Sequence, residues 1–277
     1  MSLRVATNVP SISAQKVLDS NQREMEKSFA QLSSGSRITK AADDAAGLSI
    51  SETLKSTIRG YGQAKRNASD AISMVQVTEG GLGEVSNILS RMRELGVQAA
   101  SDTVGDRERG FIDLEVQQLK NEVERIAQTT RFGSVKLLDG SGDVYQFQVD
   151  INNDDFADRI SFDAGKQNVT TSAIGIDGFD FTSKDGAREA LEQLESAQVT
   201  VNGQRATLGA IQNRLISTQE NLGSSIENFS AANSRIRDAD IAESTANLSR
   251  SQVLQTATIG ILAQANQSTA SALKLIG

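Results

Sequence analysis

The sequence predicts a mainly α protein: a long, coiled-coil-like helical rod with discontinuous terminal helices and one small β-hairpin region. Apolar residues recur every seven positions through the C-terminal half of the 277-residue chain, and similar stripes run through the N-terminal half. A period of seven indicates helices that pack along their length against other helices. Between the two halves, residues 133–184 are rich in Gly, Asp and Asn and contain a strand-like alternation.

The C-terminal stripe starts at Ala187 and predicts one long helix through residues 185–234. About 50 helical residues would span roughly 75 Å at about 1.5 Å per residue. A helix of this length does not fit the core of a compact enzyme, and it indicates a structural or assembly protein. We call its later apolar positions the helix seam: Leu194, Val201, Leu208, Leu215, Leu222, Phe229 and Ile236.

Residues 46–132 predict two further helices with matching stripes. The glycines at positions 80, 81 and 83 should loosen the first of them locally. An ordinary helical bundle is the other interpretation of these stripes, but helices in globular domains usually have about 10–14 residues. Length therefore favours a fibrous assembly. The stripe positions are Leu54, Tyr61, Ala68, Val75, Leu82 and Leu89 in the first helix, and Ile112, Val116, Leu119, Val123 and Ile126 in the second.

The segment 37–45 is predicted to be a linker between helices. Before it, residues 33–36 read Ser-Ser-Gly-Ser, and Gly35 is a plausible helix stop. At its end, Asp43 and Asp44 suit a helix N-terminus, both as caps and as negative charges beside the helix dipole.

The two terminal segments predict helices that need neighbours. Residues 251–277 carry one charged side chain, Lys274, yet their apolar residues alternate with Ser, Thr, Gln and Asn. No run reaches the roughly 20 apolar residues that a membrane span requires. An uncharged helix of this kind is unstable alone in water, and the first 36 residues offer it a partner stripe. The candidate packing residues are Leu254, Ile261, Leu262, Leu273 and Ile276.

The β region reads as a short insertion between helices. Residues 144–151 alternate as a strand, and Asp-Gly pairs at 139–140 and 177–178 are turn signals. Asp150, Asn152 and Asp154 imitate the start of a calcium loop. The pattern then fails, because Asp155 stands where Gly is needed and Ser161 where Glu is needed.

Composition argues against an enzyme and against a cofactor. The chain has no Cys and no His, which excludes disulfides and Ser-His-Asp or Cys-His catalysis and argues against zinc, copper and haem sites. A net charge of −7 disfavours nucleic acid. The first 30 residues are interrupted by charges, so no cleavable signal peptide is expected.

Several motifs resemble the terminal signatures of bacterial flagellins. On the N-terminal side they are Leu32-Ser-Ser-Gly-Ser-Arg-Ile38, Ala42-Asp-Asp-Ala-Ala-Gly47, Gln76-Val-Thr-Glu-Gly-Gly-Leu82, Met92-Arg-Glu-Leu-Gly-Val-Gln98, Phe132 and Val135-Lys-Leu-Leu-Asp139. On the C-terminal side they are Ser234-Arg-Ile-Arg-Asp-Ala-Asp240 and Leu262-Ala-Gln-Ala-Asn-Gln267. Two departures are Gly96, where Ala is common, and Ser268-Thr269, where the family usually has Pro.

The resemblance implies a short, minimal flagellin that lacks the outer variable domains. Its parts would be an N-terminal inner-tube helix (1–36) paired with 241–277, a spoke (37–45), N-terminal outer-tube helices (46–132), a small β region (133–184), a C-terminal outer-tube helix (185–234), and a C-terminal spoke and inner-tube helix (235–277).

The implied function is that of a structural subunit that polymerises into the helical flagellar filament, the propeller for motility. Such a protein is secreted and extracellular, with no membrane insertion. Its expected partners are further copies of itself, the flagellar cap, hook-junction proteins, an export chaperone and the type III export apparatus.

The resemblance also implies a surface of interest. In flagellins that an innate-immune Toll-like receptor detects, an Arg and a Leu on the first long helix and a Glu on the second form the contact. The matching positions are Arg91, Leu95 and Glu115. Helical spacing places Arg91 and Leu95 on one face. The alternative is that these residues contact neighbouring subunits in the filament, and both roles are compatible.

Two other functions remain open from sequence. A hook–filament junction protein shares the terminal helices, although the extended match of residues 76–98 and 262–267 favours the filament subunit. A helical signalling hairpin, as in chemoreceptor cytoplasmic regions, would need a mid-chain turn and a membrane anchor. This chain has a β insertion instead, and its sequence shows no anchor.

Overall fold

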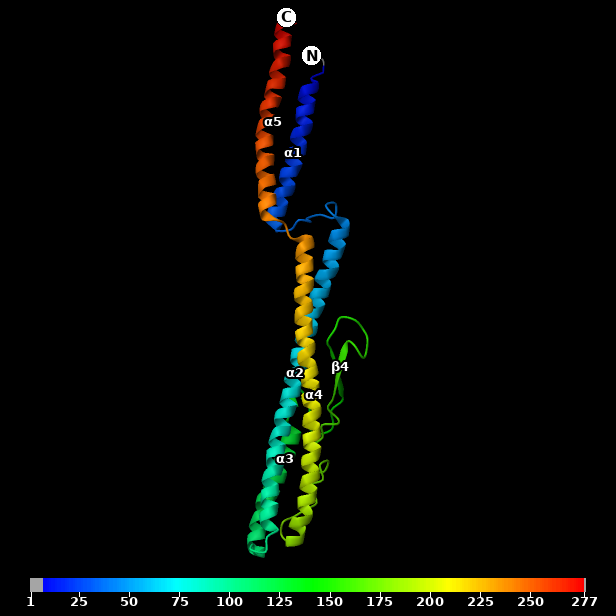
Figure 1. The fold of residues 1–277 in the computed structure, drawn as a ribbon, viewed down its shortest axis with the longest axis vertical. Coiled ribbons are helices and arrows are strands. Elements are labelled where there is room, and N and C mark those ends of the chain that lie inside the picture. The colour runs from blue at the N-terminus through cyan, green and yellow to red at the C-terminus, as the bar shows by residue number, and fades with distance from the viewer. Residues whose placement is uncertain (1–6, 277) are drawn as a thin grey trace. The chain divides into compact units, whose positions relative to one another are not determined.

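The computed structural model describes residues 7–276, and side chains through residue 268. The described residues form five helices and four short strands (Figure 1). This confirms the mainly α fold class. The helices are α1 (Val9–Ser34), α2 (Ala45–Ala99), α3 (Asp106–Thr129), α4 (Lys184–Arg237) and α5 (Ile241–Ile276); the strands are β1 (Arg131–Phe132), β2 (Val135–Lys136), β3 (Val144–Gln148) and β4 (Arg159–Asp163).

The chain divides into two compact units. The first contains the residues up to Ser56 and those from Asn228 onward, and the second is Thr57–Glu227. The first unit therefore joins both ends of the chain, whereas the second contains the middle.

In the first unit, α1 and α5 lie antiparallel and side by side (Figure 1). The most buried positions of this pair are small. They recur every seven residues on α5, which indicates a coiled-coil-like contact with closely approaching backbones. These positions are Ser11, Ala14 and Ser28 on α1, and Ser244, Ser251, Thr258 and Ala265 on α5.

The linkers that leave this helix pair run side by side. The amide of Arg37 donates to the carbonyl of Arg237 at 2.6 Å, and the amide of Ala239 donates to Gly35 at 3.0 Å. Gly35 ends α1 with a φ of 67°, a left-handed conformation that favours glycine, so the predicted helix stop is confirmed. Asp44 accepts a hydrogen bond from the Gly47 amide at 2.8 Å and caps the first turn of α2.

Asp43 does not cap that helix. Its carboxylate accepts hydrogen bonds from the Lys40 amide at 3.0 Å and from the amide and hydroxyl of Thr39 at 3.1 and 2.9 Å. The Lys40 amide and the Thr39 hydroxyl hold the pKa of Asp43 below its usual range. This carboxylate therefore organises the linker that precedes α2.

In the second unit, α2, α3 and α4 share a core with the β region. Helix-seam residues from Leu194 to Leu222 are buried, as the sequence predicts, and those up to Leu215 share a core with Leu82, Leu89 and Met92 of α2 and Val116 of α3. Phe229 and Ile236 belong to the first unit and are half-buried.

Helix α2 continues without interruption through the glycines at 80, 81 and 83. Close packing explains the second of them. A Cβ on Gly81 would lie 2.6 Å from Cδ1 of Leu138 and 3.0 Å from the hydroxyl of Thr130, so only glycine permits this approach. Tertiary contacts here outweigh the low helix propensity of glycine.

The β region contains two antiparallel hairpins, β1–β2 and β3–β4. In the second hairpin Val144 pairs with Asp163 and Gln148 with Arg159. The first hairpin has only two residues in each strand, too few for an alternation to be visible in sequence. Phe162 and Ile160 point into the core.

The loop between β3 and β4 does not resemble a calcium-binding loop in the structure, as in the sequence. The carboxylate of Asp154 forms hydrogen bonds within the loop: it accepts from the amides of Phe156 and Ala157 at 2.9 and 2.8 Å. These bonds, with Ala157 contributing most, lower the pKa of Asp154. Among the described residues no group of three or more His, Cys, Asp or Glu side chains could hold a metal ion.

Lys120 fixes the segment before α4 to α3. Its buried ammonium donates to the carbonyls of Asp177, at 3.3 Å, and Phe179, and lies 4.0 Å from the centre of the Phe179 ring. Burial lowers the pKa of this lysine.

No helix in the described part of the chain combines the length and apolar character that a membrane crossing demands.

Candidate self-assembly surfaces

Large apolar side chains of α1 and α5 face away from the contact between these two helices. Phe29 on α1 is 66% exposed, and Ile261 on α5 is 60% exposed. Exposed residues occur on both flanks of the buried α5 row and opposite it, so the helix is apolar around much of its circumference. We call this set the terminal apolar surface: Val9, Ile12, Val17 and Phe29 on α1, and Ile241, Val253, Leu254, Ile259 and Ile261 on α5.

The contact between α1 and α5 also contains polar bonds, near the start of α1. The hydroxyl of Ser11 donates to Oδ1 of Asn266 at 3.1 Å, and Nδ2 of the Asn8 side chain donates to the carbonyl of Ala265 at 3.1 Å. Such bonds fix the register of the pair, but small residues bury little apolar area. A helix that is apolar all round is typical of one covered on several sides.

The structure places the predicted packing residues of the C-terminal segment on different sides of α5. Leu254 and Ile261 are exposed and belong to the terminal apolar surface, whereas Leu262 is half-buried toward α1. Leu273 and Ile276 lie outside the residues whose side chains the structure describes.

A second surface surrounds Arg91. Its guanidinium donates to Oε1 of Glu115 on α3 through Nε and Nη2, at 3.1 and 2.9 Å, and Nη1 donates to Glu94 at 3.0 Å. All three side chains are about half exposed or more. The Glu115 hydrogen bond, followed by that of Glu94, raises the pKa of Arg91. The structure thus brings together Arg91 and Glu115, which are 24 residues apart.

Leu95 does not belong to this exposed surface. It is 3% exposed and packs in the core with Met92 and Ala99, so its placement on the same open face as Arg91 is wrong. Four residues turn a helix by about 40° beyond a full turn. Because Arg91 stands at the edge of the buried stripe, that rotation is enough to carry Leu95 inside.

Two apolar residues that sequence reasoning missed lie on α3 beside Glu115. Phe111 is 61% and Leu114 is 63% exposed. Both are large apolar residues that fall outside the buried stripe of Ile112 and Val116. That position off the stripe is the sequence signal that could have identified them. An exposed Phe and Leu on one turn are typical of an interaction surface.

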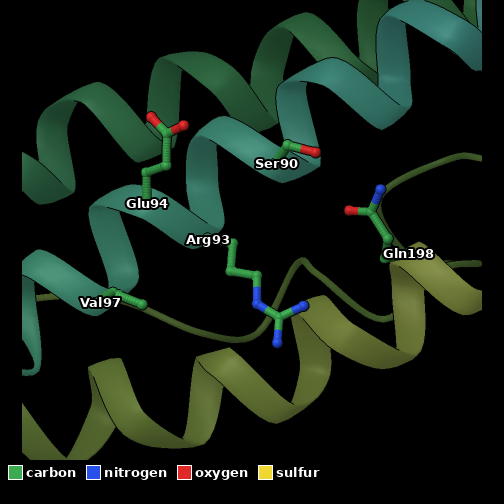
Figure 2. Close-up of a pocket in the computed structure, with 5 residues that line it drawn as sticks. All are labelled: Ser90, Arg93, Glu94, Val97 and Gln198. Carbon is green, nitrogen blue, oxygen red and sulfur yellow. The ribbon is translucent and has the colours of Figure 1, made fainter.

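An open groove lies between α2 and α4, with a volume of about 670 Å³, and it borders the Arg91 surface at Glu94. It is lined by Ser90, Arg93, Glu94, Val97 and Gln198, and Figure 2 shows Arg93 extending from α2 toward α4. Nη2 of Arg93 contacts Glu195 of α4 at 3.3 Å. The lining offers one cationic side chain, one carboxylate and two neutral polar groups, with no nucleophile held against a base, so it does not suit catalysis.

Long helices, a seven-residue seam and exposed apolar terminal helices define a self-associating structural protein. Comparison with known proteins supports this class. Family models of the bacterial flagellin N-terminal and C-terminal helical regions match residues 5–143 and 191–276. The chain belongs to the bacterial flagellin family.

Similar proteins match the chain over nearly its whole length. It is 40% identical to a flagellin of Halalkalibacterium halodurans, over 97% of this chain and 98% of the relative. It is 38% identical to the flagellar filament core protein flaB2 of Brachyspira hyodysenteriae (98% and 99%) and 35% identical to the flagellin of Bacillus subtilis (99% and 100%).

Solved structures agree. The crystal structure of Bacillus cereus flagellin matches with a TM-score of 0.51 and 31% identity, covering 61% of this chain and 94% of that chain. A putative flagellar hook-associated protein of Vibrio parahaemolyticus is 14% identical, with a TM-score of 0.59 over 71% of this chain and all of that one, a likeness of fold alone. The chain is a structural subunit of the flagellar filament that polymerises with itself, and not an enzyme. A junction protein is not favoured.

Proposed function

We propose that the two units form different layers of the filament. The terminal helices α1 and α5, with their linkers, would form the inner layer of the filament, in which neighbouring copies cover one another. The unit of α2, α3 and α4 would form the outer layer. The predicted segments are therefore retained, with α4 reaching Arg237 before the linker to α5.

One observation carries this proposal: the middle unit buries its apolar seam within the chain, whereas the terminal helices expose theirs. Apolar area exposed to water is unfavourable by about 25 cal/mol per Å². Copies that cover the terminal apolar surface recover this free energy. The surfaces that meet are different parts of the chain, so the contact is heterologous and generates an open helix.

We further propose two roles for the surface around Arg91 and Glu115. In the filament it would contact a neighbouring copy, and in the free monomer it would be open to an innate-immune Toll-like receptor. The ion pair is exposed and stands beside Phe111 and Leu114, which supports both roles. The first is the primary one, because a surface needed for assembly cannot change freely.

The remaining partners follow from family membership. We propose export through the type III apparatus without cleavage, an export chaperone for the subunit, and contacts with the flagellar cap and the hook-junction proteins. The filament would be extracellular. The absence of Cys fits this route, since no disulfide has to form or break during export of an unfolded chain.

Removal of residues 251–277 tests the inner-layer role. We expect the second unit to keep its helical content and thermal transition, because its core lies within residues 57–227. Growth from filament seeds should be lost, as judged by electron microscopy. Normal straight filaments from the shortened chain would contradict the proposal.

A pair of point variants sharpens this test. Ile261→Asp places a carboxylate on the terminal apolar surface, and Ser217→Asp places one on an exposed position of α4. We expect the first to stop seeded growth and the second to permit it, with helical content unchanged in both monomers. Loss of growth in both variants would indicate a general sensitivity to added charge instead.

A further inference from the structure

An exposed face of α2 carries two cations that have no carboxylate partner among the described residues. Between residues 57 and 69 the sequence has three basic side chains and no acidic one. Arg59 and Arg66 are seven residues apart, on one face of the helix, and both are exposed. The Arg66 guanidinium donates to Oε1 of Gln63 at 2.6 Å, and within the described chain neither arginine forms an ion pair. We call these two residues the basic stripe.

The first turns of α4 carry the opposite charge. Asp185, Glu189 and Glu192 follow the spacing of one helical face and are all exposed. Asp185 pairs with Arg188 at 3.7 Å, while Glu189 and Glu192 have no cation partner among the described residues. We call Asp185, Glu189 and Glu192 the acidic stripe. Its two free carboxylates equal in number the free guanidinium groups of the basic stripe.

The stripes are too far apart to meet within one chain. Nε2 of Gln219 on α4 donates to the hydroxyl of Ser69 on α2 at 3.0 Å, and Tyr61 lines a pocket with Asn221. The two helices run in opposite directions, so the basic stripe is level with about residues 220–227 of α4. From there to the acidic stripe is about 35 residues, or roughly 50 Å at about 1.5 Å per residue.

We propose that the basic stripe of one copy docks on the acidic stripe of a second copy in the filament. The proposal rests on assembly of this chain into a filament. Because the stripes are different surfaces, each copy offers one to the next copy on either side, and the contact repeats without closing. Successive copies joined in this way are displaced by roughly 50 Å along their helices.

The contact sets register and speeds association; the terminal apolar surface supplies most of the affinity. Exposed ion pairs contribute little free energy, but opposite charges steer encounter and reject wrong alignments. Growth should consequently slow as ionic strength rises, since exposed charges are screened.

Charge reversal tests the stripes. Arg59→Glu with Arg66→Glu, or Glu189→Arg with Glu192→Arg, should slow seeded growth at low salt by roughly tenfold. The chain with all four reversals should extend seeds made from that same chain at close to the wild-type rate, because the complementary pair is restored with its signs exchanged. The control is Arg107→Glu with Arg214→Glu, which removes the same charge from two other exposed arginines, and it should grow normally.

The melting temperature of each monomer is measured alongside, and it should not change, because all these side chains are exposed. Equal growth of every variant, or a fourfold reversal no better than the double reversals, would overturn the stripe contact while leaving filament assembly intact. A wild-type chain that cannot extend seeds would overturn assembly itself, and the stripe contact with it.

Discussion

Arg91 of α2 and Glu115 of α3 form an exposed, two-pronged ion pair, with Nε and Nη2 of the arginine 3.1 and 2.9 Å from the same carboxylate oxygen. The pair joins two helices that are already held together by a buried core. The ion pair is therefore available for contacts with other molecules. Its removal should affect filament assembly without affecting the folding of the monomer.

Replacement of Arg91 by Ala should slow filament growth by roughly tenfold, because a positive charge is lost from the proposed contact between copies. The monomer should change in stability by less than about 1 kcal/mol, as is usual for an exposed ion pair. Seeded growth and thermal unfolding measure the two effects. Arg93→Ala removes a neighbouring arginine that pairs with Glu195 and serves as the control. Free polymerisation of Arg91→Ala would remove this residue from the interface.

Replacement of Glu115 by Ala should weaken receptor activation by soluble monomer. We expect the concentration for half-maximal signalling to rise by roughly tenfold, a typical effect of truncating a central interface residue. Glu122→Ala is a matched control, since Glu122 is also on α3 and pairs only locally with Arg125 in the described structure. A wild-type monomer that is silent at micromolar concentration would rule out this receptor role.

Replacement of Leu215 by Asp should destabilise the second unit. Leu215 is fully buried, and an unpaired buried carboxylate is unfavourable by several kcal/mol unless it becomes protonated. The melting temperature should fall by on the order of 10 °C. Ile216→Asp, at the adjacent exposed position, should change it little. Equal melting temperatures for the two variants would mean that the helix seam faces water.

The linker before α2 should respond to acid through Asp43. Its pKa is lowered by the Lys40 amide and the Thr39 hydroxyl, so the folded pKa lies below 3.8. A depressed carboxyl pKa contributes stability above the unfolded pKa, and the contribution is lost as pH falls through the folded value. Exchange protection of the Thr39 and Lys40 amides should therefore persist at pH 5 and disappear in stronger acid.

The matched variant for this prediction is Asp43→Asn, which should lack the protection at every pH. A carboxyl titration of Asp43 by NMR provides the direct check. A midpoint at or above 3.8 would contradict the assigned hydrogen bonds.

Sequence patterns predict the features that depend on residues close together in the chain. Three such features were predictable: the seam from Leu194 to Leu222, the helix stop at Gly35 and the position of the β region. The continuity of α2 through Gly81 could not be predicted in this way. It depends on close packing against Leu138, which is 57 residues later in the sequence, and the sequence does not show that the two residues are in contact.

The candidate surfaces were predictable only in part. Spacing groups residues by face but does not say where burial ends, so Leu95 was placed outside when it lies in the core. The outward direction of Leu254 and Ile261 depends on which row of α5 meets α1. That row consists of small residues, which a search for large apolar side chains passes over.

The central claim is that neighbouring copies cover the terminal apolar surface. The chain has no Cys, so a single thiol introduced by Ile261→Cys can report its exposure through the rate of maleimide labelling. Leu215→Cys provides a reference that is buried in the monomer and in the filament alike. The account predicts rapid labelling at position 261 in the monomer and a rate in the filament as slow as at position 215. Equally rapid labelling at position 261 in monomer and filament would contradict it.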